Sequence, residues 1–233
     1  GKISLYKTCS TYLILSVFPT KKLEINPQAM VIVFNGEHPS YVNSRIIALG
    51  IKPHIIVGYT DDINYLFPVK KLYYPLWFLY YPNFDNKLIE EIEAKKNILI
   101  KDINEKKFCC LINSHDNNST RKPIYNSLST IDRIDCPGLL LNNVPRTLVG
   151  TTSEDKINFM NSYIFNICSE NFYGTKYLTE KLPQSLNSGC IPIYHGDLSD
   201  INSKIFNPDR IIMAKDLSPI SMLQLKKKIK KLN

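Results

Sequence analysis

Short apolar runs rich in β-branched residues alternate along this chain with longer stretches in which apolar residues recur at helical spacing. A short apolar run bounded by polar turns is typical of a buried strand, and apolar residues three and four apart are typical of a helix face. Because strands that alternate with helices form a largely parallel sheet covered by those helices, the sequence predicts the α/β class. The predicted strands are residues 12–16, 30–34, 54–57 and 71–74 in the first half and 108–112, 164–169 and 190–194 in the second.

The length of 233 residues corresponds to one or two domains, at about 150 residues per domain. A predicted helix at residues 85–96 runs into a charged, asparagine-containing segment at 96–107. Such a segment between periodic elements is typical of a boundary. We therefore expect an N-terminal lobe at residues 1–104 and a C-terminal lobe at residues 105–233.

Positive charge is concentrated at one end of the chain. The net charge is +8, and five lysines near the C-terminus leave only +3 for the remainder. A basic field over the whole chain would favour nucleic acid as a partner, whereas a local surplus is typical of a solvated helix face or a surface-docking tail. Binding of nucleic acid is therefore the least favoured functional class. The five residues are Lys226, Lys227, Lys228, Lys230 and Lys231.

The segment from Ser218 onward predicts an amphipathic helix, with Pro219 in its first turn. Its apolar stripe lies opposite the lysines, and two interpretations stay open: the stripe packs against the body of the protein, or the basic face contacts a membrane surface. No apolar run approaches the ~18 residues of a membrane span, so we expect a soluble chain. The stripe consists of Met222, Leu225, Ile229 and Leu232.

A proline at position 183 fixes where one helix of the second half can begin. Proline is tolerated only in the first turn, so we expect the helix to begin at about Glu180, with Thr179 as its N-cap and Gly189 as its stop. Lys181 and Glu180 then lie at a helix N-terminus, which favours a phosphate-bearing ligand, and Glu180 could accept hydrogen bonds from a ribose diol. The alternative is an ordinary capped helix with a surface Glu–Lys pair.

A second cation, Arg121, lies at the start of the helix predicted after the polar loop 113–120. Arginine can grip a pyrophosphate with its planar fork, and the alternative is a solvated arginine in a first turn. The carboxyl ends of parallel strands meet at one edge of a sheet, so loops 113–120, 170–174 and 195–197 are expected to converge on one site.

Metal ligands do not cluster in the sequence. The six cysteines and four histidines show no paired metal-ligand spacing. The neighbouring carboxylates Asp61 and Asp62 lie in a turn context. We therefore expect reduced, buried thiols and no metal site.

Four motifs together resemble the donor-binding signature of the α-1,3-fucosyltransferases, glycosyltransferase family ten. They are SYIFNICSEN at residues 162–171, YLTEK at 177–181, GCIPIYHG at 189–196 and FNP at 206–208. A weaker resemblance extends over the first lobe, where Glu37 follows a predicted strand. His195 occupies a position at which bacterial members commonly have tryptophan.

The resemblance implies two Rossmann-like lobes that face a cleft, the GT-B type, with a short first lobe on the acceptor side. It implies inverting transfer of L-fucose from GDP-β-L-fucose to a hydroxyl of an acceptor oligosaccharide or glycoconjugate, with no metal and no further cofactor. The compartment would be the cytoplasm for a bacterial or viral source and the Golgi lumen for a eukaryotic, membrane-anchored parent. The implied roles are Glu37 as general base, Arg121 and Lys181 at the diphosphate, Asn171 and Tyr177 in the donor pocket, and Glu180 at the ribose.

A catalytically silent sugar-nucleotide or glycan-binding module is the main alternative. Glu37 discriminates between the two, because a transferase needs that carboxylate at the cleft, opposite the cations that hold the leaving group. A nucleic-acid binder would instead show steep salt dependence and no preference for guanine nucleotides.

Overall fold

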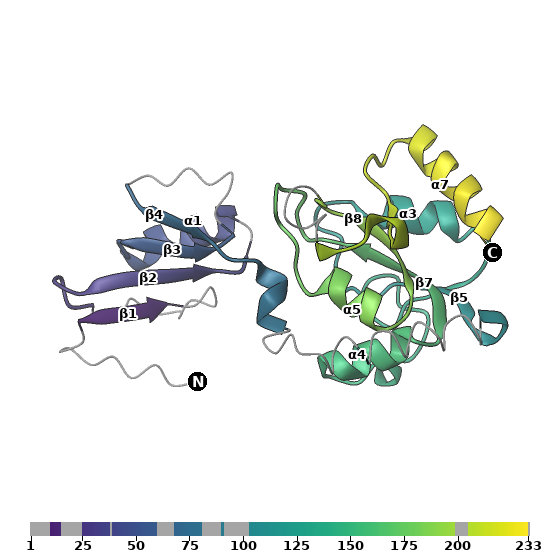
Figure 1. Ribbon diagram of the computed structural model, residues 1–233, viewed down its shortest axis with the longest axis horizontal. Helices are drawn as coiled ribbons and strands as arrows, with labels where there is room; N and C mark the ends of the chain where they lie inside the picture. The colour runs from purple at the N-terminus through teal and green to yellow at the C-terminus, as the bar shows by residue number, and fades with distance from the viewer. Residues whose placement is uncertain are drawn as a thin grey trace.

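The computed structural model describes residues 10–14, 25–37, 39–59, 68–80, 90, 103–198 and 205–232. Two parallel sheets form the molecule and lie side by side in Figure 1. The helix predicted at residues 85–96 lies, apart from residue 90, outside the described residues. The α/β class predicted from the alternation of strands and helices is confirmed.

The first sheet has four parallel strands in the order β1-β2-β3-β4. Helix α1, Pro39–Leu49, follows β2 and packs on the sheet through Val42 and Ile46, which contact the inward-facing Val31 and Val33 of β2. Proline is accepted at the start of α1 because the first N–H groups of a helix have no partner within it. The strands are β1 Thr11–Ile14, β2 Met30–Asn35, β3 Ile55–Gly58 and β4 Lys70–Tyr73.

The second sheet has five parallel strands in the order β6-β5-β7-β8-β9. All seven residues of the central strand β7 are buried, which explains its nearly continuous apolar sequence. The one amide in it, Asn166, donates to the carbonyl of Cys110 on the neighbouring strand at 3.3 Å. The strands are β5 Lys107–Cys110, β6 Ile134–Asp135, β7 Tyr163–Ser169, β8 Ile191–His195 and β9 Ile212–Met213.

Helices cover both faces of the second sheet (Figure 1). Besides α1, the described residues include four α-helices and four short 3-10 helices. They are α3 Arg121–Leu128, α4 Ser153–Met160, α5 Lys181–Asn187 and α7 Pro219–Leu232, with η1 Leu76–Tyr80, η2 Ile103–Glu105, η3 Arg146–Leu148 and η4 Pro208–Arg210.

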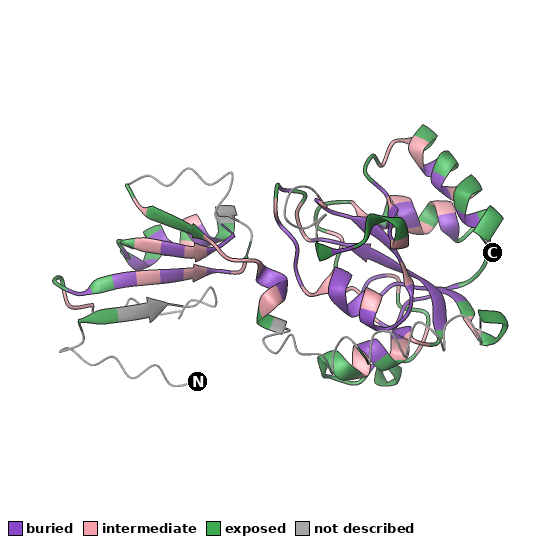
Figure 2. Ribbon diagram, in the orientation of Figure 1, coloured by how far each residue is buried: buried purple, intermediate pink, exposed green. Residues whose placement is uncertain are grey.

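The C-terminal helix α7 packs against the body of the second lobe. Its residues Met222, Leu225 and Ile229 are buried in the same core as Ile124 and Leu128 of α3. Figure 2 shows the opposite side of α7 exposed. The packing interpretation of the apolar stripe is therefore correct for these three residues, whereas Leu232 is 51% exposed. Within the described residues, none of the helices has the length and apolar character needed to cross a bilayer.

The two lobes meet through aromatic side chains. Tyr59, which follows β3, packs edge-on against Tyr177 and Phe172 of the second lobe, with ring centroids 5.1 and 6.0 Å apart. The hydroxyl of Tyr73 donates to the carbonyl of Lys176 at 3.3 Å. Strands β2 and β3 point their carboxyl ends toward the second lobe in Figure 1. Residues that follow these strands therefore approach the second lobe.

Candidate functional site

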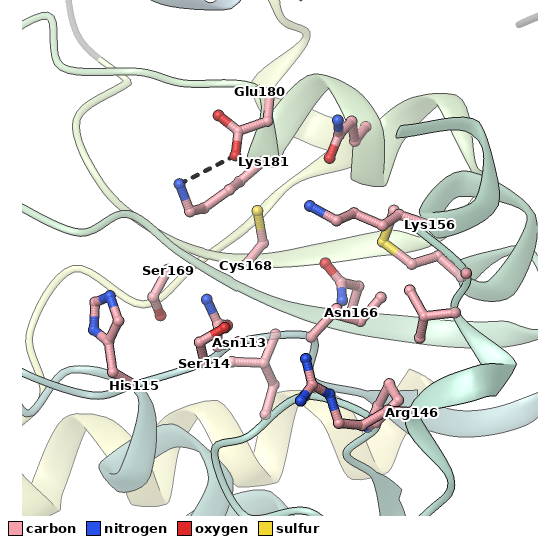
Figure 3. Close-up of a pocket in the computed structure, with 18 of the residues that line it drawn as sticks. Asn113, Ser114, His115, Arg146, Lys156, Asn166, Cys168, Ser169, Glu180 and Lys181 are labelled. Carbon is pink, nitrogen blue, oxygen red and sulfur yellow. Dashed lines mark hydrogen bonds and ion pairs between the residues drawn. The ribbon is translucent and has the colours of Figure 1, made fainter. Parts of the chain in front are cut away.

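A cavity of about 780 Å³ opens at the carboxyl edge of the second sheet. The loop after β5 contributes Asn113, and the loop after β7 contributes Asn171. Glu180 and Lys181 reach the cavity from the start of α5 (Figure 3). Two of the three loops expected to converge therefore do so. The third loop, 195–197, packs behind the site instead, where the carbonyl of His195 accepts from the amide of Glu170 at 2.9 Å.

Lys181 is held by two carboxylates. Its Nζ lies 3.4 Å from Oε2 of the fully buried Glu170 and 3.5 Å from Oε1 of Glu180, and it donates to Oγ1 of Thr179 at 2.9 Å. Burial alone would lower the pKa of Lys181, but the charges of Glu170 and then Glu180 outweigh burial and raise that pKa above its ordinary value. Lys181 is therefore a fixed positive charge across the physiological range.

The start of α5 differs from the sequence prediction. The helix begins at Lys181, Glu180 is its N-cap, and Thr179 does not cap it. The amide and the hydroxyl of Thr179 instead donate to the carboxylate of Glu170, at 2.9 and 2.7 Å. A buried carboxylate outcompetes the helix end for these donors. The predicted stop is confirmed, because the helix ends at Asn187 with Ser188 as its C-cap, and Gly189 follows with φ of +78°.

Glu180 remains a carboxylate at this position. Its burial would raise the pKa, but the charges of Lys181 and Lys156 and two hydrogen bonds outweigh burial and lower the pKa below its ordinary value. The side chain is 20% exposed, so it can meet a ligand in the cavity. The Glu–Lys pair thus lines a cavity, in contrast to the alternative of a surface pair.

Arg121 lies beneath the cavity and does not line it. Arg121 is only 2% exposed, so the alternative of a solvated arginine is wrong. The guanidinium donates to the carbonyl of His115 at 2.5 Å, to the carbonyl of Ser169 at 3.3 Å and to Oδ1 of Asn171 at 2.7 Å. Burial lowers the pKa of Arg121, although Asp116 and Glu170 oppose this shift. Arg121 therefore fixes the orientation of Asn171, whose side chain lines the cavity.

The N-terminus of α3 already has an anion of its own. The amides of Thr120 and Arg121 donate to Oδ1 of Asp116, each at 2.9 Å, and the amide of Lys122 donates to Oδ2 at 3.0 Å. These are the N–H groups that would otherwise attract a phosphate. Asp116 thus satisfies this helix end internally.

Tyr177 and Glu37 lie at the junction of the lobes. Tyr177 is 1% exposed and packs between Tyr59 and Phe172. Burial raises its pKa, and the charges of Glu170 and Glu37 add to the shift. Glu37 follows β2, is exposed, and donates its amide to Oδ1 of Asn35 at 3.0 Å. Neither side chain lines the cavity, and the charge of Glu37 contributes to the raised pKa of Tyr177.

Two cations that line the cavity were missed by the sequence predictions. Arg146 comes from η3 and Lys156 from α4 (Figure 3). The signal for α4 is its capping box, in which Oγ1 of Thr152 accepts from the amide of Asp155 at 3.1 Å. Only Ile157 and Met160 of α4 are buried, so apolar periodicity is weak there. Within the described residues, no group of three or more metal-ligating side chains is found.

The model of glycosyltransferase family 10 (fucosyltransferase), C-terminal region, matches residues 102–233. This chain belongs to that family. The match includes every residue that lines the cavity. The resemblance noted in the motifs is thereby confirmed.

Known family 10 proteins extend the comparison. The α-(1,3)-fucosyltransferase FucT of Helicobacter pylori is 32% identical over 109 residues, which are 47% of this chain and 21% of that protein. The chain thus spans about a fifth of the length of this curated relative.

Solved structures show the same fold. A crystal structure of α1,3-fucosyltransferase with GDP-fucose has a TM-score of 0.60 at 23% identity, over 94% of this chain and 65% of that one. A crystal structure of α1,3-fucosyltransferase without a named ligand has a TM-score of 0.57 at 19% identity, over 99% of this chain and 82% of that one. The predicted GT-B type is therefore confirmed for this family 10 chain.

Proposed function

We propose that this chain transfers L-fucose from GDP-β-L-fucose to a hydroxyl of an acceptor oligosaccharide or glycoconjugate, with inversion at the anomeric carbon. The observation that carries the proposal is the convergence of Asn171, Glu180 and Lys181 on one cavity at the carboxyl edge of the second sheet. Ligands of open α/β sheets bind at that edge. Two of the similar crystal structures were solved with GDP-fucose and with GDP, which supports the choice of donor.

The donor contacts follow from the charges at the cavity. Glu180 is ionised and partly exposed, so its carboxylate accepts hydrogen bonds from the ribose diol. Lys181 lies beside it and places positive charge near the diphosphate. Asn171 offers its amide from the opposite loop, where Arg121 fixes its Oδ1. The hydroxyl of Tyr177 stays protonated because burial raises its pKa, and Tyr177 lies at the junction of the lobes, next to the loop that leads into the donor site.

The transfer step needs a base on the face of the sugar opposite the leaving group. The acceptor oxygen forms a bond to the anomeric carbon while the bond from that carbon to the β-phosphate oxygen breaks, and GDP leaves with the bonding electrons. Glu37 takes the proton of the acceptor hydroxyl. It approaches from the first lobe, whereas Lys181 lies in the second, so the two groups act from different sides of the junction.

One observation favours the alternative function, a catalytically silent module that binds a sugar nucleotide or a glycan. Glu37 is exposed and does not line the cavity. Binding without transfer is expected if the first lobe does not bring that carboxylate to the sugar. The two functions therefore differ in Glu37 alone, and the donor site is common to both.

Calorimetric titration tests the donor site. GDP and ADP are each titrated into the wild-type chain, into Lys181→Ala and into Lys227→Ala, a control that removes the same charge from the exposed face of α7. We expect binding of GDP in preference to ADP, weakened by Lys181→Ala and unaffected by Lys227→Ala. Equal affinity for both nucleotides, or none for either, contradicts the proposal.

Transfer is tested separately with Glu37→Gln. The amide keeps the size of the side chain and removes the base, so we expect GDP affinity close to the wild type and loss of fucosyl transfer to a panel of acceptor oligosaccharides. Full transfer by Glu37→Gln contradicts the role of Glu37. GDP binding by the wild type without transfer to any acceptor supports the silent module.

A further inference from the structure

The charge of Lys181 is already balanced within the protein. Glu170 is fully buried at 3.4 Å from its Nζ, and Glu180 lies at 3.5 Å. Two carboxylates therefore face the ammonium group of Lys181, while the guanidinium of Arg121, which also interacts with the charge of Glu170, donates to groups beneath the cavity. A sugar nucleotide brings two further negative charges on its diphosphate. The charge of Lys181 is therefore partly offset before a ligand arrives, so this end of the cavity attracts a diphosphate less strongly than an unpaired lysine would.

Two further cations, Arg146 and Lys156, line the same cavity. Neither the guanidinium of Arg146 nor the ammonium of Lys156 pairs with any side chain in the part of the chain that the structure describes. Figure 3 shows both side chains reaching into the cavity, Lys156 from α4 and Arg146 from η3, while Lys181 enters from α5. Lys156 is close enough to lower the pKa of Glu180. The surplus positive charge of the cavity thus lies on the α4 and η3 side.

Local structure fixes the segment that carries these cations. The carboxylate of Asp155 accepts from the amides of Thr151 and Thr152, each at 2.9 Å. Gly150 has φ of +69°, and a Cβ there would lie 2.5 Å from the Asp155 carboxylate. Only glycine satisfies both conditions. The turn between η3 and α4 is therefore held in one conformation. This conformation fixes the start of α4, the helix that carries Lys156 to the cavity.

We propose that Arg146 and Lys156 bind the diphosphate of the nucleotide donor. This inference rests on the proposed function, since it assumes a nucleoside diphosphate sugar in the cavity. The planar fork of Arg146 takes two phosphate oxygens, and Lys156 contributes a point charge. Charge accumulates on the leaving diphosphate as the glycosidic bond breaks, so both cations stabilise the transition state more than the bound donor. Glu180 then holds the ribose, and Lys181 beside it adds its charge at the near end of the diphosphate.

The test uses Arg146→Ala, Lys156→Ala and the double variant, with Lys227→Ala as the control for loss of one distant charge. Circular dichroism and thermal unfolding establish that each variant is folded. The probes are GDP, inorganic pyrophosphate and guanosine, each measured by calorimetry at two salt concentrations. Hydrogen bonds to a charged group contribute about 1.5–3 kcal/mol, so each single variant is expected to lose roughly tenfold to a hundredfold in GDP affinity.

Guanosine lacks phosphates, so its affinity is expected to be the same in all variants. The double variant should also lose pyrophosphate binding and show a weaker salt dependence of GDP binding. Unchanged GDP and pyrophosphate affinity in the double variant overturns the inference while leaving the proposed function intact. Wild-type chain that binds pyrophosphate through these residues but does not prefer GDP overturns the proposed function and supports the cation pair. Wild-type chain that binds neither probe overturns both.

Discussion

Replacement of Glu170 by glutamine removes one charge from the interior of the second lobe without changing its shape. The carboxylate accepts from the amide and hydroxyl of Thr179 at 2.9 and 2.7 Å, from Lys181 at 3.4 Å and from Tyr194 at 3.4 Å. Glutamine has one acceptor oxygen in place of two, so one of these donors faces an NH₂ group instead. Lys181 also loses its buried counter-charge.

The size of the effect follows from the burial of the two partners. Breaking a buried ion pair costs about 3–5 kcal/mol. The side chain of Lys181 is 20% exposed and keeps Glu180 at 3.5 Å, so part of that cost is recovered. We therefore expect Glu170→Gln to lower the free energy of unfolding by about 2–4 kcal/mol.

Equilibrium urea unfolding, followed by tryptophan fluorescence and by circular dichroism, measures this difference. The matched control is Glu105→Gln, which removes the same charge from an exposed position in η2 and should change stability by less than about 0.5 kcal/mol. A Glu170→Gln variant as stable as this control would refute the reasoning. It would mean that Thr179 and Lys181 are satisfied without the carboxylate.

Three further predictions concern the second lobe. Hydrogen bonds and charges from Arg133, Tyr163 and Lys107 lower the pKa of Asp135 despite its burial. The contribution of Asp135 to stability is therefore present above the unfolded pKa of about 3.9 and is lost as pH falls through the lower folded pKa. Acid unfolding should accordingly depend less steeply on pH in Asp135→Asn than in the wild type. Gly150→Ala should weaken GDP binding and destabilise α4, because a Cβ would lie 2.5 Å from the Asp155 carboxylate. A wild-type GDP affinity in calorimetry and a wild-type unfolding temperature would contradict the fixed turn. Ile229→Ala should lower the free energy of unfolding by about 2–5 kcal/mol, since Ile229 of α7 is fully buried in the core of the second lobe. An unchanged free energy in urea unfolding would show that α7 does not pack on the lobe.

Apolar patterning was sufficient to predict most of the sheet. Strands β2, β5, β7 and β8 lie within a residue or two of their predicted ranges. Strands β5, β7 and β8 are mostly buried, and β2 alternates between buried and partly exposed residues, so each sequence reflects its burial directly. Helix α4 escaped prediction, since it buries only two side chains and is specified by a polar capping box. Arg146 and Lys156 were missed with it.

Long-range contacts account for the other differences. The cap of α5 depends on Glu170, which lies on the preceding strand end and takes both donors of Thr179. The role of Arg121 as a phosphate ligand stays a prediction, and its position at a helix start did not indicate that its guanidinium donates to two carbonyls and to Oδ1 of Asn171. Sequence spacing places residues along the chain and does not reveal which distant partner will compete for them.

The aromatic junction between the lobes has a consequence for hybrid enzymes. The amide of Glu37 is held by Asn35, and Asn35 in turn donates to the carbonyl of Tyr59 at 2.7 Å. The ring of Tyr59 packs on Tyr177 and Phe172, which belong to the loop that leads into α5. A first lobe transplanted from another family member must therefore bring a matching aromatic side chain at position 59. Without it, the grafted Glu37 segment and the resident loop that leads into α5 would lose the contact that aligns them.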